Sequence, residues 1–155
     1  MNHPRVSVVT PSFNQAAYLE QTIQSVLDQG YPNLEYMIVD GGSTDGSVEI
    51  IRKYAHRLTW WVSEKDNGQA DAINKGFSRV TGEIIGWLNS DDVYQPGSIQ
   101  AAVDAFQANR DAGLVYGDVV SVDGANHPIN LMRFEPYTLA DLMAFKIICQ
   151  PGVMM

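Results

Sequence analysis

The residues of this chain best suited to chemistry lie in the stretch 89–92, which reads Asn-Ser-Asp-Asp. The stretch follows an apolar run, residues 83–88, that is typical of a buried β-strand. Carboxylates gathered at the end of a strand are costly unless a cation or hydrogen-bond donors compensate them. A hard divalent cation with oxygen ligands would do so. The same residue types also favour an ordinary surface turn, so this stretch alone leaves both interpretations open.

Two further polar loops follow predicted strands earlier in the chain. The β-branched run 5–10 predicts a first strand followed by a loop to residue 14, and the run 34–40 predicts a second strand followed by a loop to residue 45. Strands and helices alternate, which predicts an α/β fold with a mostly parallel sheet flanked by helices. Ligands bind beyond the carboxyl ends of the strands in such sheets. We therefore expect the three loops to form one crevice.

The remaining elements follow from hydrophobic periodicity. Further strands are expected at residues 58–62, 83–88 and 114–122, and helical spacing recurs over residues 19–27, 48–55, 69–77 and 99–106. A turn is expected at Asp123 and Gly124, a less regular stretch after Pro128, and a helix start at residues 138–141. The three tryptophans lie in apolar strands and are expected to belong to the core: Trp60, Trp61 and Trp87.

Length and composition fit one acidic domain. The 155 residues carry 18 Asp and Glu against 10 Lys and Arg, a net charge of −8, so we expect no nucleic-acid partner. Cys149 is the only cysteine, which excludes an internal disulfide and favours a reducing compartment. No segment approaches the roughly 20 apolar residues of a membrane span. The expectation is a cytoplasmic protein without an integral membrane segment, which leaves peripheral attachment to a membrane open.

The sequence lacks the motifs of other nucleotide-binding and metal-binding proteins. A dinucleotide-binding dehydrogenase needs its glycine fingerprint in the first strand-to-helix turn, and residues 10–14 contain no glycine. A phosphate-binding P-loop is excluded because no Gly-Lys-Ser/Thr sequence occurs. The scattered histidines and Cys149 give neither zinc nor thiol–imidazole spacing.

Three motifs in order resemble the family 2 glycosyltransferases of GT-A fold. They are VVTPSFN at residues 8–14, IVDGGSTDG at 38–46 and LNSDD at 88–92. The resemblance covers nearly the whole chain. It implies a single GT-A domain over residues 1–155 that transfers a sugar, with inversion, from a nucleotide diphosphate donor to an acceptor hydroxyl. A UDP-sugar is the leading donor, while GDP and dTDP stay open.

The resemblance also implies roles for individual residues. Asp40 would accept a hydrogen bond from the nucleotide base, in a pocket that Pro11 and Ser12 line through their backbone. Asp91 would hold Mg²⁺ or Mn²⁺ against the diphosphate, with Asp92 as a second ligand or as its support. The ion would neutralise the charge that grows on the leaving group.

The segment 66–76 also resembles a family segment that borders the donor. Gln69 and Asp71, in the first turn of a predicted helix, would meet phosphate or sugar hydroxyls, together with Asn89 and Ser90. Asn89 departs from the family pattern, which has a carboxylate there, so the set of direct metal ligands stays open. The family often carries an arginine where this chain has Ile73, so no phosphate contact is expected from that position.

The resemblance assigns no general base to this chain. An inverting transferase needs one to take the acceptor's proton, and the family's acidic motif for it lies beyond the position of Gln150. We therefore expect a chain truncated at its C-terminal, acceptor-binding side, with the catalytic base beyond Met155. The acceptor class is a glycan or a lipid-linked sugar, as in polysaccharide biosynthesis. The alternative is a nucleotide-sugar-binding module without turnover, which could form a homo-oligomer through exposed apolar surface.

Overall fold

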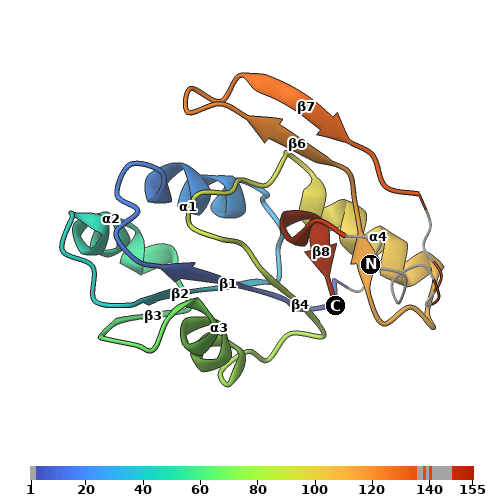
Figure 1. The fold of residues 1–155 in the computed structure, drawn as a ribbon. Helices are drawn as coiled ribbons and strands as arrows, with labels where there is room; N and C mark the ends of the chain where they lie inside the picture. The colour runs from blue at the N-terminus through green and yellow to red at the C-terminus, as the bar shows by residue number, and fades with distance from the viewer. Residues whose placement is uncertain (1–2, 136–137, 139, 141–147) are drawn as a thin grey trace.

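A computed structural model describes residues 3–135, 138, 140 and 148–155. A four-stranded parallel sheet forms its centre, in the order β3-β2-β1-β4 (Figure 1). Its strands are β1 (Val6–Ser12), β2 (Leu34–Asp40), β3 (Trp60–Ser63) and β4 (Ile84–Trp87). The predicted α/β class and the parallel sheet are confirmed.

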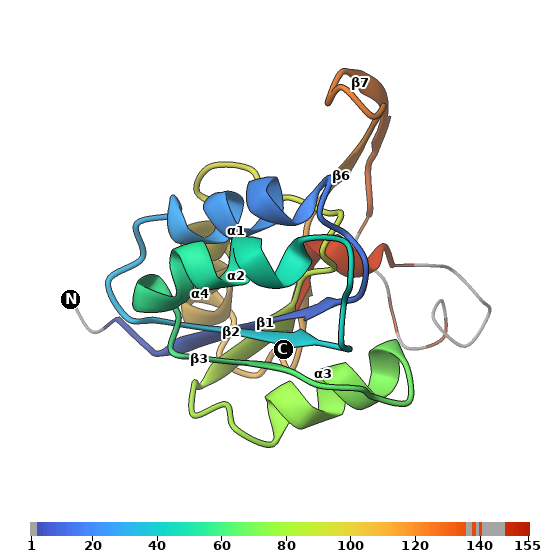
Figure 2. The ribbon, with the colours of Figure 1, turned by 90° about the vertical axis from the view of Figure 1, so that its left-hand side faces the viewer.

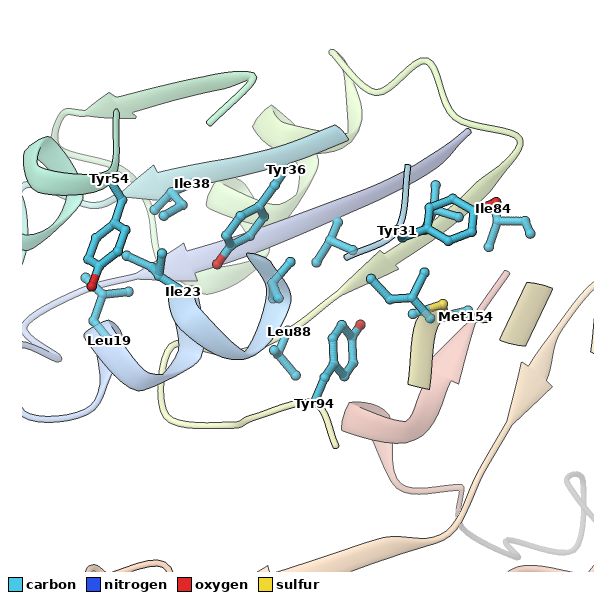
Figure 3. Packing of buried hydrophobic residues seen from close by; sticks show 14 of the residues in the cluster. Leu19, Ile23, Tyr31, Tyr36, Ile38, Tyr54, Ile84, Leu88, Tyr94 and Met154 are labelled. Atoms are coloured by element: carbon cyan, nitrogen blue, oxygen red, sulfur yellow. The ribbon is translucent and has the colours of Figure 1, made fainter. Parts of the chain in front are cut away.

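Helices cover both faces of this sheet, because its strands are apolar on both sides. The helices are α1 (Leu19–Leu27), α2 (Ser47–Tyr54), α3 (Gln69–Phe77) and α4 (Ser98–Ala108), with a short 3₁₀ turn η1 (Ala55–Arg57) after α2. Val8 and Ile38 face the cluster that includes residues of α1, α2 and α4 (Figure 3). Val9 and Val39 point the other way and pack with Ala72 of α3. Residues that alternate along a strand thus fill two separate cores.

The C-terminal part adds two small antiparallel pairs beside the central sheet. The strand β5 (Val115–Tyr116) pairs with β8 (Val153–Met154), which follows the 3₁₀ turn η2 (Gln150–Gly152). The strands β6 (Val119–Val122) and β7 (Pro128–Met132) form a hairpin that extends away from the α/β body (Figure 2). Ile85 of β4 and Met155 exchange both backbone hydrogen bonds, at 2.6 and 2.9 Å. β8 therefore lies along the outer edge of β4.

The prediction of a single strand over residues 114–122 is wrong. β5 pairs with β8, and Gly117 continues that pairing by donating its backbone N–H to the Gly152 carbonyl at 3.0 Å, whereas β6 pairs with β7. The stretch after Pro128, expected to be less regular, forms β7. The helix start expected at residues 138–141 lies outside the described residues.

The other expected elements are present, with shifted ends. The second strand and the third helix have the predicted bounds, and the turn at Asp123 closes the hairpin, with its backbone N–H donating to the His127 carbonyl at 3.0 Å. Pro11 and Ser12 extend β1 instead of opening the loop, since they pair in register with Val39 and Asp40. The three tryptophans are half-buried and pack against the two cores, as expected.

A polar network fixes the end of the sheet opposite to the three loops. The buried Glu35 carboxylate accepts hydrogen bonds from the Ser7 hydroxyl at 2.5 Å and from the Thr81 backbone N–H at 2.8 Å. Burial acts to raise the pKa of Glu35, but these hydrogen bonds and the charge of Arg5 outweigh it and hold the pKa below its ordinary value of 4.5. The network joins β1 and β2 to the loop before β4.

This network predicts a pH-dependent contribution to stability. We expect Glu35→Gln to lower the free energy of unfolding by about 1–2 kcal/mol at pH 7, because a charged acceptor of several hydrogen bonds is lost. A lowered pKa stabilises the fold fully above the unfolded-state pKa, and this contribution is lost as the pH falls through the folded-state pKa. The difference between wild type and variant should thus be constant above about pH 5 and shrink below it. Urea unfolding followed by circular dichroism between pH 3.5 and 7 measures it.

The exposed carboxylate of α2 supplies the control. Glu49→Gln removes a charge that is paired only with Arg52 on the surface, so its effect should stay within a few tenths of a kcal/mol. If the stability lost in Glu35→Gln grew as the pH fell, this result would contradict a lowered pKa of Glu35 in the folded state.

Candidate functional site

The carboxyl ends of the parallel strands open into a cavity of about 760 Å³. Loops that follow β1, β2, β3 and β4 contribute to it, together with the start of α3. The crevice predicted from the three polar loops is therefore present, with β3 as a fourth contributor. Its lining residues are Pro11, Ser12, Phe13, Gln15, Gly41, Gly42, Lys65, Asp66, Gly68, Gln69, Ala72, Asn89, Ser90 and Asp91.

The structure brings most of the residues predicted from the sequence to this cavity. Six of them line it: Pro11, Ser12, Gln69, Asn89, Ser90 and Asp91. Asp92 lines a smaller neighbouring cavity of about 280 Å³ between α4 and the C-terminal strands, and Asp91 lines both cavities. Asp40 and Asp71 line neither of them.

Asp40 is a buried support beneath the loop that follows β2. Its side chain is fully buried, and its Oδ2 accepts hydrogen bonds from the backbone N–H of Gly42 at 3.1 Å and of Ser43 at 2.9 Å. The Ser63 hydroxyl donates to the same oxygen at 2.6 Å, and the Ser43 hydroxyl donates to Oδ1 at 2.5 Å. Three of these four donors thus bind Oδ2, and one binds Oδ1. Asp40 thereby shapes the floor of the cavity.

Asp71 serves the first turn of α3. Its Oδ2 accepts a hydrogen bond from the backbone N–H of Asn67 at 3.0 Å. The backbone N–H of Gly68, the residue before the helix, donates a hydrogen bond to Asp66 Oδ1 at 2.9 Å. A carboxylate at this end of a helix also favours the helix dipole. The Asp71 contact thus ties Asn67 to the first turn of α3, and Gln69 is the residue of this turn that lines the cavity.

Asn89 is held on all sides by other amides and a carboxylate. Its Oδ1 accepts a hydrogen bond from Gln69 Nε2 at 2.8 Å, and its Nδ2 donates to Asp92 Oδ2 at 3.0 Å and to Gln150 Oε1 at 3.1 Å. Gln150 in turn donates to the Trp87 carbonyl at 2.6 Å. The amide thus ties the acidic loop to α3 and to the C-terminal segment. It orients Asp92 rather than presenting a free oxygen.

The two adjacent carboxylates have different surroundings. Asp91 is exposed, and within the described part of the chain its carboxylate accepts no hydrogen bond. Asp92 is half-buried, and burial raises the pKa of its carboxyl group. The hydrogen bond from Asn89 opposes that rise, and the negative charge of Asp91 adds to it. Of the pair, Asp91 is the acceptor that is available to a ligand.

The pair fits a hard divalent cation, although no full protein ligand set surrounds it. Among residues 3–135, 138, 140 and 148–155, no three His, Cys, Asp or Glu side chains gather in a group that could hold a metal. Mg²⁺ is usually bound by one or two carboxylates that leave the remaining positions to water and substrate phosphates. Asp91 and Asp92 supply that number of carboxylates.

The sequence reasoning missed several residues of the cavity wall. Phe13 is 60% exposed although it is a large aromatic side chain. Lys65 is the one cationic side chain that lines the cavity among the described residues. Lys75, which lies two positions after Ile73, is bound to Glu64 at 2.7 Å and does not line it. The signal that could have revealed the wall is the position of residues 63–68 directly after a strand.

Ser12 contributes an unusual hydroxyl group to this wall. Its side chain is 4% exposed, and its Oγ has no hydrogen-bond partner within the part of the chain that the structure describes. A buried polar atom without a partner is rare in folded proteins and calls for an explanation. Because Ser12 lines the cavity, a bound molecule is one source of such a partner.

No helix within the described residues has the length and apolar character needed to cross a bilayer.

The fold and the site together define a class of protein. A parallel α/β sheet with a cavity beyond its strand ends, beside an acidic loop, is consistent with nucleotide-sugar transferases of GT-A fold, because open α/β sheets bind ligands at that edge. The family described as Glycosyl transferase family 2 matches residues 7–150. The chain belongs to this family.

Individual relatives agree with that assignment. An uncharacterized glycosyltransferase of Nostoc sp. is 32% identical over 151 residues, which cover 96% of this chain and 46% of the relative. The chain therefore spans less than half the length of that protein. A mannosyltransferase of Pyrobaculum calidifontis, solved with GDP-Man and Mn²⁺, is similar at 30% identity and a TM-score of 0.69, over 81% of this chain and 39% of its own.

A further solved structure shows the fold alone. It is residues 1–349 of TarS from S. aureus in complex with UDP-GlcNAc, with 22% identity and a TM-score of 0.70 over 77% of this chain and 36% of that chain.

Proposed function

We propose that the cavity binds the nucleotide diphosphate part of a sugar donor, and that the protein transfers this sugar, with inversion, to an acceptor hydroxyl. Family membership and the similar mannosyltransferase solved with GDP-Man support the donor class. The observation that carries the proposal is the position of Asp91. Its exposed carboxylate lies at the wall shared by both cavities, where a metal-bound diphosphate could reach it.

The charge of the cavity explains why a cation is part of this proposal. The described lining residues include two carboxylates, those of Asp66 and Asp91, and one cationic side chain, that of Lys65. A diphosphate entering alone would meet net negative charge. We infer that Asp91, with Asp92, holds Mg²⁺ or Mn²⁺ there, and an ion so bound would neutralise the charge of the leaving group. The neighbour from Pyrobaculum calidifontis was solved with Mn²⁺.

The other lining residues are assigned to the nucleoside and to the sugar. Pro11 and Ser12 form the wall at the end of β1, and the exposed ring of Phe13 beside them offers a stacking surface for a base. Gln69 and Ser90 lie by the acidic loop, within reach of the diphosphate and the sugar. Asn89 positions Asp92 through its amide, as its hydrogen bonds indicate.

One observation favours a second candidate function, a donor-binding module without turnover. The only carboxylates that line the larger cavity among the described residues are Asp66 and Asp91. Neither is left over as a general base if both serve the donor. In the proposed transferase the base therefore comes from elsewhere in the protein. The acceptor, a glycan or a lipid-linked sugar of polysaccharide biosynthesis, would then contact that part too.

Calorimetric titration separates these functions. UDP and GDP are titrated into the protein with Mn²⁺, with Mg²⁺ and with EDTA, and donor hydrolysis is measured in parallel with UDP-glucose and GDP-mannose. Metal-dependent binding with hydrolysis supports the transferase, and metal-dependent binding without hydrolysis supports the module. A protein that binds neither nucleotide with either metal would overturn both proposals.

A further inference from the structure

We propose that Gln150 is a positioning residue of the donor site. Through the amide of Asn89, it fixes the direction of the Asp92 carboxylate and thereby supports the metal-dependent binding of the nucleotide. This inference rests on the proposed function and deepens it. It assigns part of that binding to a residue that lies 61 positions after Asn89 in the sequence.

Gln150 contacts the acidic loop but lines neither of the two cavities. Its Oε1 accepts a hydrogen bond from Asn89 Nδ2 at 3.1 Å, and its Nε2 donates to the Trp87 carbonyl, at the end of β4, at 2.6 Å. Since the side chain lies outside both cavities, its influence on a ligand there has to pass through Asn89.

The Trp87 carbonyl sets the direction of both amides. A backbone carbonyl only accepts hydrogen bonds, so the NH₂ group of Gln150 lies toward Trp87 and its oxygen lies toward Asn89. That oxygen needs a donor, so the NH₂ group of Asn89 lies toward Gln150, where it also reaches Asp92 Oδ2 at 3.0 Å. The oxygen of Asn89 is left to accept from Gln69 Nε2, at 2.8 Å. Gln150 thus decides which group Asn89 presents to the carboxylate.

The backbone of the acidic loop has a separate anchor. Thr22 of α1 is fully buried, and its Oγ1 donates to the Asp92 carbonyl at 2.8 Å. The backbone N–H of Asp92 donates to the Asn89 carbonyl at 3.1 Å. Neither contact involves Gln150. Loss of the Gln150 amide should therefore free the Asn89 side chain to turn while the backbone of the loop stays in place.

Gln150 is itself held by the strand that follows it. It is the first residue of η2, and β8 comes directly after that turn. Ile85 of β4 and Met155 exchange both backbone hydrogen bonds, which fixes this segment along the edge of the sheet. A supporting residue on a regular element orients its partner precisely. The docking of the C-terminal strand thus helps to order the acidic loop.

The experiment is a double-mutant cycle on Gln150 and Asn89, with UDP and GDP titrated in the presence of Mn²⁺ and of EDTA. Gln150→Met should weaken binding with Mn²⁺ by about 10-fold, the lower end of the loss that follows when a metal ligand loses its supporting contacts. Binding in EDTA should be unchanged, because Gln150 lines neither cavity. In the Asn89→Ala background, Gln150→Met should weaken binding by less than about twofold, since the effects of coupled residues do not add.

A second variant tells the two contacts of Gln150 apart. Gln150→Glu keeps an oxygen for the NH₂ group of Asn89 and loses the donor to the Trp87 carbonyl. It should therefore bind nucleotide with Mn²⁺ more tightly than Gln150→Met does. If Gln150 served only to satisfy Trp87, both variants would lose the same affinity, and this result would count against the proposal.

Gln100→Met is the matched control, because it removes an exposed amide of α4 that bonds to Asp104 and lines neither cavity. Its affinity should equal that of the wild type, and urea unfolding verifies that each variant is folded. An unchanged Mn²⁺-dependent affinity in Gln150→Met, or an equal loss with and without Asn89, would refute the positioning role alone. A wild type without Mn²⁺-dependent binding of either nucleotide would overturn the proposed function, and this inference with it.

Discussion

Asp91→Ala is expected to abolish the metal dependence of nucleotide binding. Asp91 is the exposed carboxylate shared by both cavities, and no third acidic, histidine or cysteine ligand lies near it among the described residues. Loss of supporting contacts around a metal costs about 10- to 100-fold in affinity, so loss of a direct ligand should cost at least 100-fold. Titration of UDP with and without Mn²⁺ should give the same weak affinity in this variant.

Asp92→Asn and Asp104→Asn complete that experiment. Asp92 is half-buried and held by Asn89, so its conversion to an amide should weaken Mn²⁺-dependent binding by a smaller factor than Asp91→Ala. Asp104 lies on α4, accepts a surface hydrogen bond from Gln100 and lines neither cavity, so its variant should bind as the wild type does. Metal-dependent affinity that survives in Asp91→Ala would show that the ion, if bound, is held elsewhere.

Asp40→Ala should have the largest effect on stability. The substitution leaves two backbone N–H groups and two hydroxyl groups without their acceptor in a buried place. Each unsatisfied buried donor costs about 1–3 kcal/mol, which suggests a total of at least about 3 kcal/mol. This is a large part of the 5–15 kcal/mol typical of a folded domain. Urea unfolding at pH 7 measures the change.

Asp71→Ala provides the comparison. It removes a carboxylate that accepts one exposed hydrogen bond, from the Asn67 N–H, and such a loss costs about 1 kcal/mol. If Asp40→Ala unfolded at the wild-type urea concentration and yet lost UDP binding, Asp40 would contact the base, as the sequence motif implies. The Asp40→Ala variant thus tells support of the cavity floor from recognition of the nucleotide.

Much of the fold follows from local pattern. The bounds of β2 and α3 match their predictions because a short apolar strand that is buried on both faces and a helix of period 3.6 are encoded within a few residues. The prediction failed at residues 114–122, where Gly117 bonds to Gly152 across 35 positions. A partner so distant in sequence leaves no periodic signal, so the break between β5 and β6 could not be found locally.

The sequence by itself determined the α/β class and the set of polar loops, including Asp91, because parallel strands bring their carboxyl ends to one edge. Only the tertiary structure decided what each carboxylate does there. Asp40 and Asp66 are both acidic residues after strands, but packing buries the first under four donors and leaves an oxygen of the second free in the cavity. Burial and hydrogen-bond partners are set through space, by residues far apart in the chain, and they decide whether a carboxylate supports the fold or meets a ligand.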